Sequence, residues 1–136
     1  MTQQSLFDEL GGEPVLRKII DRFVDRLFDD VMIGFLFQAG SATRERIKEK
    51  EFELAAQHLG APVEYTGRPL QTAHRRHKIM TGHFMRRLQI LKDTLDEHGV
   101  SERVRRHWVD LTLEQMPLVM NPENDQCQPP PARKGD

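Results

Sequence analysis

"PVLRKIIDRFVDRLFDD", residues 14–30, decides the fold class of this chain. Apolar residues recur in it every three or four positions, so they form one stripe along an α-helix. Pro14 stands where a first-turn proline belongs, just after a pair of glycines. The spacing predicts an amphipathic helix that ends near Asp29 and Asp30 and whose apolar face must pack against other helices.

The segment after this helix is punctuated by glycine. The run "VMIGFLF", residues 31–37, is interrupted by Gly34 and predicts a buried corner rather than a long helix. Ser41 or Thr43 is then expected to cap a second helix, which Gly60 closes as a C-terminal glycine.

The second helix carries polar residues on the face that should be buried. Ile47 and Leu54 share one face by helical spacing, and Lys50, Glu51 and His58 fall on that same face. Polar groups on a buried stripe need partners or a ligand. We therefore expect these polar residues to have partners or a ligand.

Two further helices are predicted in the second half of the chain. Thr81 is expected to cap a third long helix that Gly99 stops, and Ser101 to cap a last helix that ends at Pro117. With no alternating strand pattern, the chain is predicted to be all-α, with four principal helices and two short ones. Either an antiparallel bundle or a globin-like packing of crossed helix pairs around a cofactor fits this pattern.

Composition narrows the classes of partner. The 20 basic and 21 acidic residues nearly cancel and are spread along the chain, which argues against nucleic-acid binding. No run approaches the roughly eighteen apolar residues that span a bilayer, and the polar opening lacks the order of a signal peptide. We expect a cytoplasmic protein without membrane or nucleic-acid partners.

Cys127 is the only cysteine in the sequence. A single cysteine excludes an internal disulfide, a cysteine-rich zinc site and covalent haem attachment through a C-x-x-C-H motif. It lies in the polar, proline-rich residues 121–136, which we expect to be a disordered tail after a single domain of residues 1–120.

Six histidines are the remaining candidates for a metal ligand. The run "HRRH" places His74 and His77 three apart on a short basic segment, but no nearby carboxylate completes the roughly four ligands of a structural zinc site. A haem iron needs only one imidazole and an apolar slot. His83, His98 and His107 suit helix ends or polar faces, whereas His58 falls on the face of the second helix that should be buried.

Several motifs in a fixed order carry a resemblance to a known family. They are "LFDELGG" (6–12), "RFVDRLFDD" (22–30), "LGAPVEYTGRPL" (59–70), "TAH" (72–74) and "HFMRRLQILKDTLDEHGV" (83–100). In this order the chain resembles the truncated, two-over-two haemoglobins, and group 1 among them. The resemblance runs from about Leu6 to Met116 and implies a globin-like two-over-two helical sandwich around haem b.

The resemblance also implies the residues of the haem site. His74, in "QTAH", takes the place of the proximal ligand to the iron, and Phe37 matches the phenylalanine that packs on the haem. Basic residues beside His74 are candidates for pairing with haem propionates. The other positions expected to line the pocket or its edge are Ile47, Lys50, Glu51, Leu54, Tyr65, Leu70, His77, Ile79, Phe84 and Leu88.

The distal side departs from the family pattern. Val24 stands where group 1 members usually carry a tyrosine, and Glu51 where glutamine is common, yet an ionised glutamate only accepts hydrogen bonds. Lys50 either turns inward, as a donor or an iron ligand, or stays in an outer ion pair and leaves an apolar pocket. We favour the outer position, since exposed lysine is the commoner case. His58 lies a turn too far along for easy ligation and is a weaker distal candidate.

The resemblance implies reversible binding of oxygen, nitric oxide or carbon monoxide at an iron held by His74. Family activities include oxygen transport, ligand sensing and nitric oxide dioxygenation, the last with an electron-donating reductase. Because position 24 holds valine rather than tyrosine, we leave nitric oxide dioxygenase activity open. The alternative is a helical sensor or interaction module of globin fold that binds haem weakly or not at all.

Overall fold

The protein is described here by a computed structural model, which describes residues 5–40, 42–66 and 80–119. Every regular element within these ranges is a helix, as the sequence predicts. The helices are α1 (Leu6–Leu10), α2 (Gly12–Asp29), α3 (Gly34–Gln38), α4 (Arg44–His58), α6 (Thr81–Glu97), α7 (Glu102–Glu114) and α8 (Met116–Val119).

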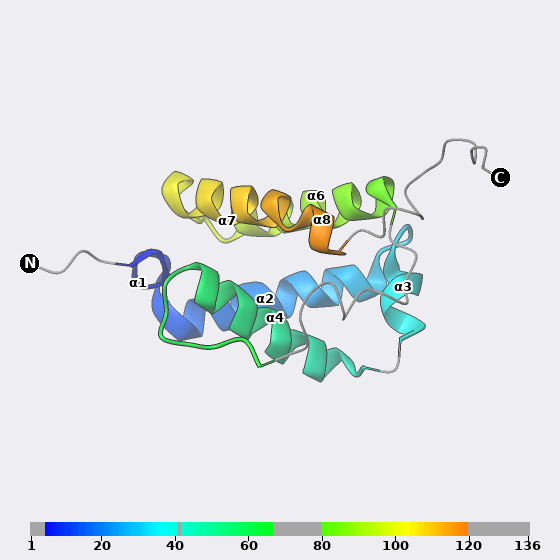
Figure 1. Ribbon diagram of the computed structural model, residues 1–136, viewed down its shortest axis with the longest axis horizontal. Coiled ribbons are helices and arrows are strands. Elements are labelled where there is room, and N and C mark those ends of the chain that lie inside the picture. The colour runs from blue at the N-terminus through cyan, green and yellow to red at the C-terminus, as the bar shows by residue number, and fades with distance from the viewer. Residues whose placement is uncertain (1–4, 41, 67–79, 120–136) are drawn as a thin grey trace, which may run out of the picture.

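The long helices form two layers. Figure 1 shows α6 and α7 lying side by side over a second layer made of α2 and α4. The short helices α1 and α3 cap the two ends of the lower layer. This arrangement confirms the predicted two-over-two helical sandwich.

Helix α2 is the centre of the fold. It packs against α1, α3 and α4 and, across the layers, against α6. The predicted apolar stripe is confirmed, because the helix buries one residue every three or four positions: Leu16, Ile19, Ile20, Phe23, Val24, Leu27 and Phe28. Burying side chains of this size contributes about 1.5–3 kcal/mol each, so the hydrophobic stripe of α2 is the main reason that the two layers hold together.

Three predicted helix boundaries are confirmed. The Thr43 hydroxyl accepts a hydrogen bond of 3.1 Å from the backbone N–H of Arg46, which makes Thr43 the cap of α4. The Ser101 hydroxyl likewise accepts the backbone N–H of Val104 at the start of α7. Gly60 follows α4 with a φ of 93°, a backbone conformation that favours glycine.

Two predicted boundaries are wrong. Thr81 is the first residue of α6, and Met80 occupies the cap position, where its backbone N–H donates to Nδ1 of His83 at 3.2 Å. Helix α7 ends at Glu114 rather than at Pro117. The proline instead lies in the first turn of α8, where its missing N–H costs no helical hydrogen bond.

The corner at residues 31–37 is buried on one side only. Ile33 and Gly34 are buried, whereas the side chain of Val31 is 96% exposed and Phe35 is also largely exposed. The buried side forms because Gly34 packs directly against the backbone of Phe28. The prediction of a corner is therefore right, but its apolar outer side is largely exposed at Val31, Met32 and Phe35.

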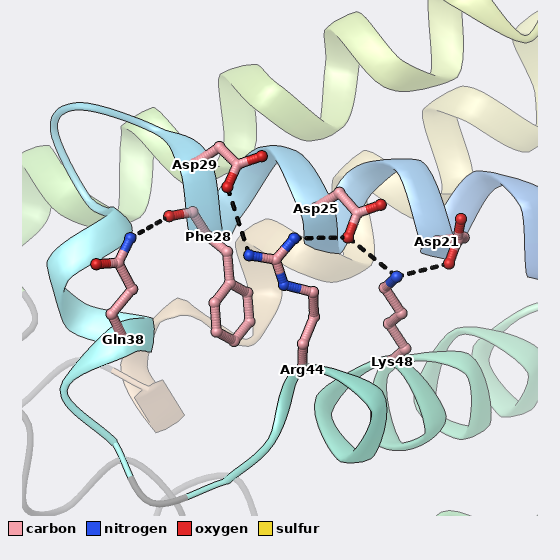
Figure 2. A network of polar contacts seen from close by, with 7 residues as sticks. All are labelled: Asp21, Asp25, Phe28, Asp29, Gln38, Arg44 and Lys48. Carbon is pink, nitrogen blue, oxygen red and sulfur yellow. Dashed lines mark hydrogen bonds and ion pairs between the residues drawn. The ribbon is translucent and has the colours of Figure 1, made fainter.

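A row of ion pairs joins α2 to α4, as Figure 2 shows. Lys48 lies between Asp21 and Asp25 at 2.6 and 3.0 Å, and Arg44 pairs with Asp25 at 3.0 Å and with Asp29 at 3.4 Å. Partial burial works against the charge on Lys48, but these carboxylates outweigh it and raise the pKa of the amine. The row of charges covers one edge of the α2 and α4 layer.

None of the described helices is long and apolar enough to cross a bilayer. The predicted tail of residues 121–136, with Cys127, lies outside the described residues.

Candidate functional site

The apolar residues predicted to line the site lie on α4 and α6. Ile47 of α4 is partly buried against the main hydrophobic cluster, and Leu88 of α6 belongs to that cluster. Phe84, one turn earlier on α6, is only 4% exposed, and Leu54 of α4 is half-buried. Among the described residues neither Phe84 nor Leu54 belongs to the main cluster, so part of the apolar surface of both helices faces elsewhere.

Phe37 is placed by the short helix α3. Its ring packs against Phe28 of α2 with 5.7 Å between ring centroids, and its side chain is partly buried. Gln38, the next residue, donates from Nε2 to the backbone carbonyl of Phe28. The end of α2 therefore fixes the position of the aromatic side chain that is predicted to pack on the haem.

Glu51 has a partner that spacing along the sequence does not predict. Nη2 of Arg87, on α6, lies 3.0 and 3.1 Å from the two carboxylate oxygens of Glu51. Both side chains are about three-quarters buried, at 24% and 25% exposure. The guanidinium carbon of Arg87 lies 5.0 Å from the centroid of the Phe23 ring on α2. Polar residues on the predicted buried face of α4 are thus paired, as expected, but across the two layers.

One sequence signal pointed to Arg87. It lies three residues after Phe84, so helical spacing places it on the same face as a residue that is expected to line the pocket. The aromatic ring beside the Glu51–Arg87 pair belongs to Phe23, the residue before Val24, and the family resemblance does not point to it.

The structure places Lys50 away from this pair. Its Nζ donates to the hydroxyl of Thr66 at 2.7 Å and lies 3.7 Å from Glu53, an i,i+3 partner on the same helix. This is the outer of the two positions considered from the sequence. The amine is therefore engaged at the side of α4 and not directed at Glu51 or Arg87.

The loop that follows α4 is tied back to that helix. The backbone N–H and the hydroxyl of Thr66 both donate to Oε1 of Glu53, at 2.9 and 2.8 Å. The backbone N–H of Tyr65, whose side chain is partly buried, donates to Oε1 of Gln57 at 2.8 Å. The hydrogen bond from the backbone of Thr66 lowers the pKa of Glu53. These bonds fix where the chain leaves α4 before the segment that contains His74.

His58 is directed toward α7. Its Nε2 accepts a hydrogen bond of 2.7 Å from the side-chain amide of Gln115, and its backbone carbonyl accepts one of 3.0 Å from Nε2 of His107. Burial, and then the nearby His107, lower the pKa of His58, while Glu51 acts in the opposite direction. His58 therefore serves the packing of α4 on α7 in this structure.

Comparison with known proteins identifies the family. Residues 5–120 match the bacterial-like globin family. A group 1 truncated haemoglobin of Mycolicibacterium paratuberculosis is 32% identical over 96 residues, which cover 71% of this chain and 69% of that protein.

The chain belongs to the truncated haemoglobins.

Solved structures agree on the fold of this truncated haemoglobin. A truncated haemoglobin of Tetrahymena pyriformis in the Fe(III) form superposes with a TM-score of 0.79 at 20% identity, covering 87% of this chain and 99% of the other. A group II truncated haemoglobin of Bacillus anthracis gives a TM-score of 0.79 at 19% identity, covering 89% and 94%. The predicted family is confirmed, and the fold is that of haem globins.

Four predicted site residues of this truncated haemoglobin lie outside the described residues. They are His74, with the proximal role, and Leu70, His77 and Ile79. The segment that holds them connects the anchored loop after α4 to the start of α6. Their roles remain predictions from the resemblance.

The described part of the site fits a haem by its apolar surface. Residues 5–40, 42–66 and 80–119 bring together no group of three His, Cys, Asp or Glu side chains that would suit a bare metal ion. They do supply apolar side chains on α4 and α6 that are not part of the main cluster, namely Leu54 and Phe84. A porphyrin needs such apolar walls and only one axial side chain.

A separate surface cavity of about 840 Å³ lies between α2 and α6. Nine of its ten lining residues have charged side chains, so it does not suit the apolar body of a porphyrin. It contains none of the predicted haem-site residues. The lining residues are Arg22, Asp25, Arg26, Asp29, Asp30, Arg86, Ile90, Asp93, Asp96 and Glu97.

Proposed function

We propose that this truncated haemoglobin binds haem b, with His74 as the axial ligand of the iron, and reversibly binds oxygen and other diatomic gases. The observation that carries the proposal is the apolar surface of Leu54 and Phe84, which belongs to α4 and α6 but not to the main cluster of the described residues. The segment with His74 connects these two helices in the sequence. Family membership supports the same role.

The haem, when bound, supplies the iron at which a gas is held. The protein's own residues supply the rest of the site. Ile47, Leu54, Phe84 and Leu88 provide apolar walls that keep water away from the iron, and Phe37, positioned by Phe28, packs at the end of the pocket. Basic residues beside His74 are proposed partners of the propionates.

Reversible binding of oxygen, nitric oxide or carbon monoxide is the function we favour over enzymatic turnover. Sustained nitric oxide dioxygenation needs an electron donor, and among the described residues neither Phe23 nor Val24 offers a hydroxyl to a ligand. We further propose that the protein acts in the cytoplasm.

Absorption spectroscopy after addition of haemin tests the proposal directly. We expect one equivalent of haem to bind and to give an intense, sharp band, and we expect His74→Ala to lose or greatly weaken it. His98→Ala is the matched control, because His98 lies at the exposed end of α6 and its Nδ1 contacts the carbonyl of Thr94. This variant should keep the spectrum of the unmodified protein.

Two results would contradict the proposal. If the protein gives no sharp band after haemin is added, the alternative of a globin-fold sensor or interaction module takes its place. If His74→Ala binds haem with an unchanged spectrum while His98→Ala does not, the axial ligand has been assigned to the wrong histidine.

A further inference from the structure

We propose that Arg87 is the hydrogen-bond donor to a gas bound in this site, and that Glu51 is the positioning residue that holds its guanidinium. The inference rests on the proposed function, because it assumes that the haem site lies between α4 and α6. It goes further by naming the side chain that stabilises the bound ligand.

Three helices bring their side chains together at this point. Arg87 extends from α6 to Glu51 on α4, and its guanidinium lies over the ring of Phe23 on α2. Ile47 and Leu54 lie on either side of Glu51 along α4, roughly one turn away in each direction. The ion pair is therefore a polar spot within the otherwise apolar surface that is expected to face the haem.

Other described side chains near α4 are poorly suited to donate. An ionised Glu51 can accept hydrogen bonds but cannot donate one. Lys50 donates to Thr66 and pairs with Glu53, and the Nε2 of His58 accepts from Gln115. Lys50 and His58 are therefore already engaged with partners other than the Glu51–Arg87 pair.

Arg87 retains donors after it has bound Glu51. A guanidinium has five N–H groups, and both contacts with the carboxylate come from Nη2. Within the described part of the chain, Nη1 and Nε make no further hydrogen bond. With about three-quarters of the side chain buried, these donors act in surroundings where a charged hydrogen bond is stronger than in water.

The competing explanation is that the pair only ties α4 to α6. The two explanations differ in how they depend on the sign of the charge. A positive group near a bound carbon monoxide lowers its C–O stretching frequency, and a negative group raises it, because each polarises the ligand in the opposite sense. Removing Arg87 and removing the charge of Glu51 should therefore shift the frequency in opposite directions. If the ion pair only holds α4 and α6 together, the two variants have no reason to shift the frequency in opposite directions.

The experiment uses the full chain loaded with haem, with carbon monoxide as an infrared probe. Arg87→Met should raise the C–O stretching frequency, and Glu51→Gln should lower it. Arg87→Met should also speed oxygen dissociation by at least about tenfold, the effect of losing about 1.4 kcal/mol of stabilisation. Arg86→Met is the matched control, since Arg86 is the preceding residue and pairs with Asp30 at the α2–α6 cavity. It should leave both values unchanged.

Arg87→Lys keeps the positive charge and tests whether any effect of Arg87→Met is merely a loss of folding. It should bind haem and retain a frequency close to that of the unmodified protein. Unchanged frequency and dissociation rate in a folded, haem-loaded Arg87→Met would overturn this inference but leave the proposed function intact. Shifts in the same direction for Arg87→Met and Glu51→Gln would also overturn it. A chain that takes up no haem overturns the proposed function, and this inference with it.

Discussion

The backbone carbonyl of Phe28 accepts a hydrogen bond of 2.6 Å from Nε2 of Gln38, which joins the end of α2 to the end of α3 (Figure 2). The same carbonyl lies against the Cα of Gly34, at the start of α3. This close approach sets the position of Phe37, whose ring packs on Phe28. The corner thus depends on a residue without a side chain.

Gly34→Ala should destabilise the protein. A Cβ at this position would lie 2.5 Å from the Phe28 carbonyl oxygen and 3.2 Å from Nε2 of Gln38, so α3 has to move away. We expect the free energy of unfolding, measured with urea, to fall by about 1–3 kcal/mol, as for overpacked sites.

Gly82→Ala provides the opposite case on α6. A Cβ there meets no atom within 4 Å, and alanine favours a helix more than glycine does. The free energy of unfolding should rise by about 0.5–1 kcal/mol. If both alanine variants are destabilised equally, the close approach at Gly34 is not the cause.

Asp30→Asn should remove a buried anchor between α2 and α6. The Asp30 carboxylate, 6% exposed, accepts hydrogen bonds from Nε and Nη2 of Arg86 and from the backbone N–H groups of Met32 and Ile33. Because an amide is uncharged, these hydrogen bonds are weaker in the variant. The free energy of unfolding, measured with urea at pH 7, should fall by about 1–3 kcal/mol. Asp110→Asn, at an exposed position on α7, should change little.

The loss of stability at low pH should also depend on Asp30. The Arg86 guanidinium, helped by the backbone of Met32 and Ile33, holds the pKa of Asp30 below its usual value. Because the folded state binds this proton less readily than the unfolded state, the stabilisation is complete above about pH 4 and is lost as the pH falls through the folded pKa. Urea titrations from pH 5 to 2 should give a shallower decline for Asp30→Asn than for the unmodified chain. Equal slopes would contradict the assignment.

His58 should govern stability at a higher pH. Burial and His107 lower its pKa in the folded state, so the unfolded chain binds a proton more readily there. Its contribution is complete above about pH 6.5 and declines as the pH falls below that value. His58→Gln, which does not titrate, should flatten the pH dependence of the urea midpoint between pH 7 and 5. His98→Gln, at the exposed end of α6, is the control and should retain the slope.

Leu27→Ala should reveal how much α2 contributes to the core. Leu27 is fully buried within the main cluster, so truncation removes apolar contacts and leaves a cavity. We expect a loss of about 2–5 kcal/mol in the free energy of unfolding. Leu113→Ala, on α7 and 40% exposed, should cost much less. Similar losses for the two variants would show that α2 does not dominate the packing.

The helices were predictable from the sequence because their signals are local. The repeat of apolar residues in α2, the hydroxyls of Thr43 and Ser101 and the glycine at position 60 each act within a few residues of the feature they predict. The end of α7 was missed because Pro117 fits the first turn of a new helix as well as it ends an old one. Sequence spacing alone does not separate these two uses of proline.

The site was predictable only in part, because pairing between helices depends on the packed fold. Spacing along α4 correctly indicated that Glu51 needs a partner, but Arg87 comes from a helix 36 positions away in the sequence. The outer position of Lys50 depends on Thr66, which reaches α4 only through the loop that doubles back after Gly60. Such contacts have no local pattern.

The row of charges between α2 and α4 has a further consequence for how these helices align. Asp21, Asp25 and Asp29 repeat every four residues, as do Arg44 and Lys48. If α4 slid by one turn, about 5.4 Å, most positive groups would again meet a carboxylate. The apolar side of α4 does not repeat in this way, because its buried residues are the large Phe52 and, three and four positions later, the small Ala55 and Ala56. The charges therefore attract the two helices without selecting their register, and the shapes of the buried side chains select it.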